Sequence, residues 1–90
     1  MSIDDIDLTE LFPRTIFRFS PLEQLRRVGT EVEETRLEIE ANNPDGILHE
    51  SIDIVQGVFT LLYNQGYTNA QIIQAIKDTQ NKNRARGYYE

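Results

Sequence analysis

Two short turns divide this 90-residue chain into three long segments, and their brevity constrains the fold more than any other feature. The first turn is NNPDG at 42–46, and the second surrounds Gly66. Asn, Pro, Asp and Gly favour chain reversal. Helices joined by so few residues lie side by side and antiparallel. We therefore expect an all-α protein built as an antiparallel helical bundle.

Capping boxes mark the starts of the first and third helices. In this motif a Ser or Thr caps the helix, and a Glu or Gln three residues later returns the hydrogen bond. SPLE begins at Ser20 and TNAQ begins at Thr68. These motifs predict one helix that ends at about Ala41 and another that ends at about residues 82–84.

The middle helix is the most apolar of the three. Asp45 is its predicted cap, and Gly66 is typical of a position just beyond a helix C-terminus. Apolar side chains cover more than half of the circumference over residues 47–63, so we expect this helix to be largely buried. Gly57 lies inside it, which indicates either close helix packing or room for a nucleotide.

Residues 1–19 form a lead-in segment to a core at 20–90, within a single domain at 1–90. The lead-in is expected to carry one short helical turn before Pro13 and an extended stretch that docks on the bundle. A chain this short buries a modest part of its surface and gains stability from assembly. We therefore predict a homodimer or homotetramer that completes the bundle.

Eight acidic residues and one basic residue lie between Glu31 and Asp53. On the first helix, Glu31 and Glu34 share one face and Glu38 continues it, because residues three or four apart are neighbours. On the middle helix, Glu50 and Asp53 form a similar pair, and no Lys or Arg of that helix is available to neutralise them.

Two explanations of these carboxylates remain open. Acidic residues on a helix commonly form a solvated face. Alternatively, the pairs from two antiparallel helices converge, and four carboxylates then suit a hard divalent ion such as Mg²⁺ or Mn²⁺ that also contacts substrate phosphates. A carboxylate pair out of water is costly unless it binds a cation, and this favours the metal site.

The order and spacing of these residues resemble a known family. Glu31-x-x-Glu34, followed after fifteen residues by Glu50-x-x-Asp53, is similar to the metal motif of MazG-like nucleoside triphosphate pyrophosphohydrolases, which are all-α. The basic C-terminal stretch NKNRARGYY resembles the one that follows in many members. The resemblance covers roughly residues 22–88.

The resemblance implies Mg²⁺-dependent hydrolysis of nucleoside or deoxynucleoside triphosphates to the monophosphate and pyrophosphate. Glu31, Glu34, Glu50 and Asp53 would then bind the metal ion. Lys82, Asn83 and Arg86 would contact phosphate. Many members carry a further Glu directly before the first ligand, where this chain has Thr30, so Glu38 is expected to join Glu34 in the catalytic role of orienting water.

Two alternative functions stay open beside this one. The first is phosphoribosyl-ATP pyrophosphohydrolase, whose related motif has a doubled Glu where this chain has Thr30-Glu31. The second is a non-enzymatic helical interaction module. A net charge of −6 disfavours a nucleic-acid duplex as partner, because duplex binding depends on cationic contacts to phosphate. No apolar run approaches the roughly 20 residues of a membrane span, and the acidic N-terminus lacks a secretory signal, so we expect a cytoplasmic protein.

Overall fold

The computed structural model describes residues 2–90, and every regular element in that range is helical. Two short elements, η1 (Ile3–Asp5) and α1 (Leu8–Leu11), precede three long helices. These are α2 (Pro21–Glu40), α3 (Pro44–Asn64) and α4 (Asn69–Ala85). The all-α prediction is confirmed, and so is the short helical turn before Pro13. None of the described helices is long and apolar enough to cross a membrane.

Helix α2 begins where the sequence predicted, but its capping box is incomplete. The backbone N–H of Glu23 donates a hydrogen bond of 3.2 Å to the hydroxyl of Ser20. The Glu23 carboxylate does not return to the cap. It pairs instead with Arg26 and, at 3.6 Å, with Arg27. Ion pairing along the exposed helix surface therefore replaces the second half of the motif.

The prediction that Asp45 caps α3 is wrong. Asn43 is the cap, and its side chain accepts a hydrogen bond from the N–H of Gly46. Pro44 decides between the two candidates, because Pro favours the first helical position and the cap must precede it. Asn42 adopts a positive φ of 53°, a conformation that Asn tolerates better than most residues and that reverses the chain.

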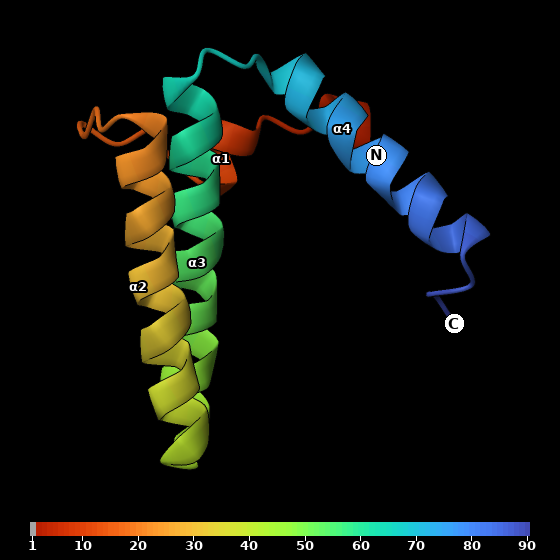
Figure 1. The fold of residues 1–90 in the computed structure, drawn as a ribbon. Helices are drawn as coiled ribbons and strands as arrows, with labels where there is room; N and C mark the ends of the chain where they lie inside the picture. Colours follow the sequence, from red (N-terminus) through yellow and green to blue (C-terminus); the bar gives the residue numbers. More distant parts are fainter. Residues whose placement is uncertain (1) are drawn as a thin grey trace.

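Helices α2 and α3 lie side by side as an antiparallel hairpin (Figure 1). A Cβ atom placed on Gly57 would lie 2.9 Å from Cγ2 of Val28, so the two helices approach too closely there for any larger residue. Nearby, the buried Gln24 donates a hydrogen bond of 3.0 Å to the Gly57 carbonyl. Close packing, one of the two explanations of Gly57, is therefore confirmed.

Helix α4 follows a complete capping box and turns away from the hairpin. Thr68 and Gln71 exchange both hydrogen bonds of the motif, as predicted. Gly66 has a φ of +85°, which suits a Gly just past a helix end. From this turn α4 diverges from α2 and α3, so that its C-terminal end lies far from both (Figure 1).

The main hydrophobic core lies where the N-terminal segment meets the facing ends of α3 and α4. Its buried members are Leu8, Tyr63, Ile72 and Ile73. Asn69 fixes this junction, because it accepts a 2.8 Å hydrogen bond from the Leu8 N–H and donates one of 2.8 Å to the Ile6 carbonyl. The divergent direction of α4 is thus set by packing and hydrogen bonds to the N-terminal segment.

Within one chain, α2 and α3 alone form an antiparallel pair of long helices, and completion of the bundle by a second copy stays a prediction. Because α4 turns away from the α2–α3 hairpin, apolar side chains of α2 and α3 remain exposed to solvent. They include Leu25, Val32 and Ile39 of α2, and Leu48, Ile52, Val55 and Val58 of α3, all at least 37% exposed. The expectation that the middle helix is largely buried is therefore wrong for one chain, whose α3 is buried mainly near its C-terminal end.

Candidate metal centre

The register of the hairpin brings acidic residues from both helices to the same height. Glu31 and Asp53 each lie eleven residues from Asn42 in the turn, and Glu34 and Glu50 each lie eight. Residues equally distant from a tight turn face one another in an antiparallel pair. The i,i+3 spacing within each pair then places both members on adjoining parts of one helix face. The carboxylates therefore meet across the α2–α3 interface.

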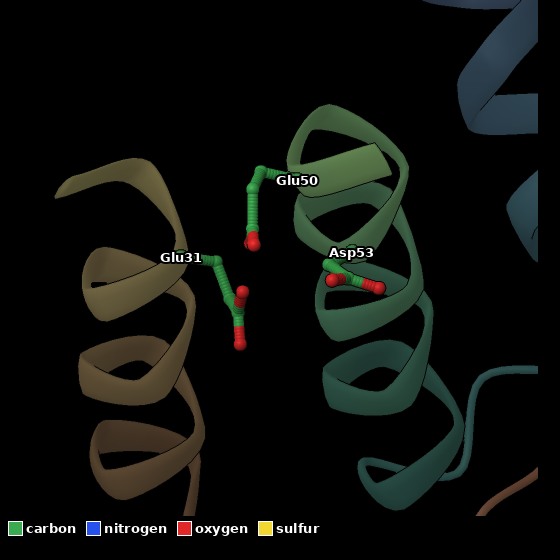
Figure 2. Close-up of side chains that lie close together, drawn as sticks. All are labelled: Glu31, Glu50 and Asp53. Atoms are coloured by element: carbon green, nitrogen blue, oxygen red, sulfur yellow. The ribbon is translucent and has the colours of Figure 1, made fainter. Parts of the chain in front are cut away.

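Three of the four predicted ligands form a compact cluster. One carboxylate oxygen from each of Glu31, Glu50 and Asp53 lies within 4.8 Å of the other two. Figure 2 shows Glu31 extending from α2 toward α3 and Glu50 extending toward it. Glu31 and Glu50 are half-buried, whereas Asp53 is exposed. We call these three residues, with the adjacent Glu34, the acidic cluster.

The fourth ligand candidate and the proposed water-orienting residue occupy different places. Glu34 adjoins the cluster, and its carboxylate contributes to the raised pKa values of Glu31 and Glu50. Glu38 lies about one turn beyond Glu34 along α2, where its carboxylate accepts a 2.7 Å hydrogen bond from Nδ2 of Asn43. In this position Glu38 stabilises the turn between the helices and does not reach the cluster.

Among the described residues, no Lys, Arg or His forms an ion pair with a carboxylate of the acidic cluster. The nearest basic residue along α2, Arg36, donates 2.5 Å hydrogen bonds to Glu33 and Glu40 on another face of that helix. On an ideal helix Glu33 and Glu40 lie roughly opposite Glu31, so these ion pairs form away from the cluster. The cluster therefore carries concentrated negative charge.

The pKa values of Glu31 and Glu50 are raised, first by burial and then by the neighbouring carboxylates. Burial raises the pKa of Glu31 to about 7, and hydrogen bonding with Glu34 and Glu50 adds to the effect, as does repulsion from Glu34 and Asp53. Burial also raises the pKa of Glu50, followed by hydrogen bonding with Glu34. The cluster consequently binds a proton near neutral pH unless another cation takes its place.

A buried carboxylate oxygen without a hydrogen-bond partner supports the cluster as a site that suits a cation. Oε2 of Glu50 is buried and has no hydrogen-bond partner among the described residues. A buried carboxylate oxygen without a donor is costly, and a bound cation removes that cost. Two oxygens that share one Mg²⁺ lie about 3–4 Å apart when each metal–oxygen bond is about 2.1 Å. One oxygen each of Glu31, Glu50 and Asp53 lies within 4.8 Å of the other two, which is close to that spacing.

The predicted phosphate contacts do not reach the cluster within one chain. Lys82, Asn83 and Arg86 lie at the C-terminal end of α4, which diverges from the hairpin (Figure 1). There Asn83 donates a 3.1 Å hydrogen bond to the hydroxyl of Tyr89. A contact between these residues and the cluster would require α4 of a second copy.

A pocket of about 330 Å³ adjoins the acidic cluster, and sequence reasoning did not foresee it. Glu31 and Asp53 form part of its wall, and Arg27 brings the one cationic side chain among its described lining residues. The Arg27 guanidinium lies over the Phe19 ring, 3.7 Å from its centroid. The i,i+4 spacing of Arg27 and Glu31 could have indicated that both face the same site.

Comparison of this chain with models of protein families, with curated proteins and with solved structures gives no significant match. The functional argument therefore rests on the residues of the site and their geometry. The resemblance to MazG-like enzymes stays an interpretation of the motif.

Proposed function

We propose that this protein is a Mg²⁺-dependent nucleoside triphosphate pyrophosphohydrolase. One observation carries the proposal: carboxylates from two helices converge within 4.8 Å, and among the described residues they have no ion-pair partner and a buried oxygen of Glu50 has no donor. Such an oxygen-only set suits Mg²⁺ or Mn²⁺ together with phosphate oxygens. A solvated acidic face would not leave a carboxylate oxygen buried.

The acidic cluster supplies the metal ligands in this proposal. Glu31, Glu34, Glu50 and Asp53 hold the ion between α2 and α3. When bound, the ion neutralises charge on the phosphates and favours attack by water. The oxygen of that water bonds to the α-phosphorus as the bond from the α-phosphorus to the bridging oxygen breaks. The products are a nucleoside monophosphate and pyrophosphate, and the proton of the water passes to a carboxylate of the cluster or to solvent.

Cationic side chains complete the phosphate contacts. Arg27 lines the pocket beside Glu31 in the same chain, and we assign it a contact with a phosphate oxygen. We assign Lys82, Asn83 and Arg86 to contacts made from a second subunit, because α4 carries them away from the cluster of its own chain. The negative cluster and the positive end of α4 are complementary in charge.

The proposed enzyme is a homodimer or larger homo-oligomer. An open groove of about 590 Å³ lies between α3 and α4, and its walls are largely apolar, including Val58, Phe59 and Ile76. The exposed apolar side chains of the hairpin match that groove in character. Helices of a second copy would cover both surfaces and complete the bundle.

A panel of nucleoside and deoxynucleoside triphosphates, with phosphoribosyl-ATP included, tests the activity through Mg²⁺-dependent release of pyrophosphate. We expect release from at least one triphosphate and its loss in the Glu50→Gln variant. The Glu33→Gln variant is the matched control, because Glu33 pairs with Arg36 away from the cluster. Release from phosphoribosyl-ATP alone would identify the alternative enzyme. If no substrate releases pyrophosphate, the enzyme proposal falls and an interaction module remains.

A further inference from the structure

The pocket beside the acidic cluster has a wall that belongs to neither helix. Its outer side is the extended part of the lead-in segment, which contributes Thr15, Phe17 and Phe19. Its inner side is the α2–α3 hairpin, at the level of Gln24 and Thr60. At about 330 Å³ the pocket falls within the size range of small-molecule sites.

Side chains of α3 hold this lead-in wall in place. The Tyr63 hydroxyl donates a 2.9 Å hydrogen bond to the Phe12 carbonyl, and Gln56 donates one of 3.1 Å to the Pro13 carbonyl. Asn64 donates a third, of 3.0 Å, to the carbonyl of Phe17. Three side chains of one helix therefore bind three backbone carbonyls of a segment that has no regular structure of its own. These hydrogen bonds fix the position of the pocket wall relative to α3.

The pocket combines aromatic surface with polar groups. Phe17 and Phe19 stack with their ring centroids 5.7 Å apart, and Phe17 remains 54% exposed. On the inner side, Gln24 and Thr60 are buried, with 6% and 4% of their surface exposed. Thr15 adds a buried hydroxyl that has no hydrogen-bond partner among the described residues. A flat aromatic face together with unsatisfied hydrogen-bonding capacity matches a planar heteroaromatic ring.

We propose that this pocket binds the base of a nucleotide, with the base stacked on Phe17. The inference rests on the proposed function for the position of the phosphates, which would meet the acidic cluster where Glu31 and Asp53 line the same pocket. Thr15 offers its hydroxyl to an edge of the base. The lead-in segment is thus the base-recognition element, and the hairpin is the phosphate-recognition element.

Binding of nucleoside 5′-monophosphates in the presence of Mg²⁺, compared with ribose 5-phosphate, tests this inference. The probes are AMP, GMP, CMP and UMP, with binding followed by NMR chemical-shift titration. We expect at least one nucleotide to bind more tightly than ribose 5-phosphate. Stacking of a base on an aromatic side chain predicts that Phe17→Ala weakens nucleotide binding by about 5- to 150-fold. Ribose 5-phosphate binding should not change.

Two further variants separate base recognition from general damage. Ile16→Ala is the matched control, because Ile16 is 89% exposed on the same segment and does not line the pocket. Thr15→Val removes the hydroxyl at nearly constant volume and should weaken nucleotide binding alone. The inference is overturned if Phe17→Ala and Thr15→Val leave nucleotide affinity unchanged, or if they weaken nucleotide and ribose 5-phosphate equally.

The titration and the pyrophosphate-release assay together distinguish failure of this inference from failure of the proposed function. Pyrophosphate release without dependence on Phe17 would overturn the base site and leave the enzyme intact. Phe17-dependent nucleotide binding without any pyrophosphate release would support the base site and overturn the enzyme. If the wild-type protein binds ribose 5-phosphate and all four nucleotides equally, or binds none of them, the base site is overturned.

Discussion

The raised pKa of Glu31 predicts an unusual pH dependence for the metal-free protein. The folded protein holds a proton on Glu31 up to about pH 7, whereas an ordinary Glu releases it near 4.5. Between these values the folded state binds more protons than the unfolded state. The contribution of Glu31 to stability is therefore fully present below the unfolded value and is lost as the pH rises through about 7.

The size of this effect follows from the shift. At about 1.4 kcal/mol for each pKa unit, the change from 4.5 to about 7 corresponds to roughly 3 kcal/mol of unfolding free energy. Glu31 is half-buried, and solvent screening reduces the figure to about 1–2 kcal/mol. For a domain of this size, the melting temperature should then fall by roughly 4–16 °C between about pH 5 and about pH 8.

Thermal melting followed by circular dichroism, with EDTA present, measures this fall. Glu31→Gln should flatten the dependence, because the amide carries no titrating proton. Glu33→Gln should retain it, because the pKa of Glu33 is lowered by its hydrogen bond to Arg36 and does not contribute in this window. A wild-type melting temperature that stays constant or rises from about pH 5 to about pH 8 would refute the reasoning.

Three further predictions concern packing, assembly and substrate binding. Gly57→Ala should destabilise the fold by about 1–3 kcal/mol, because the new methyl would meet Val28. Gly29→Ala, which has nothing within 4 Å of the new methyl, should stabilise it by about 0.5–1 kcal/mol. Equal effects of the two substitutions in chemical denaturation would contradict the packing analysis. Light scattering at micromolar concentration should give a dimer or larger, and a 10.4 kDa monomer would contradict the assembly. Lys82→Ala and Arg86→Ala should raise KM more than they lower kcat in steady-state kinetics, because the proposed function assigns these residues contacts with the triphosphate in both ground and transition states. A fall in kcat alone would be evidence against this role.

Local features of the sequence were sufficient to predict the helices and the convergence of the carboxylates. Helix starts depend on neighbouring residues, and Ser20 and Thr68 cap where expected. The position of the turn near Asn42 then fixes which residues of α2 and α3 face one another. The meeting of Glu31, Glu50 and Asp53 follows from that register.

Features that depend on distant contacts were not predictable in the same way. The direction of α4 depends on the core around Leu8 and on the hydrogen bonds of Asn69, and no periodic pattern encodes either. Glu38 shares a helix face with Glu34, but its hydrogen bond with Asn43 engages it in the turn. An apolar stripe along a helix predicts that this face is buried. It does not indicate whether another helix of the same chain or a second copy buries it.

Binding of Mn²⁺, detected by the loss of the free-ion signal in electron paramagnetic resonance, tests the central claim most directly. We predict that the wild-type protein binds the ion at pH values above the pKa of Glu31, and that Mg²⁺ competes for the same site. Glu50→Gln and Asp53→Asn should weaken binding by at least about 10-fold. Glu33→Gln and Glu40→Gln should bind like the wild type, because both residues pair with Arg36 outside the cluster. Equal Mn²⁺ binding by all five proteins, or no binding by the wild type, would contradict a metal centre between α2 and α3.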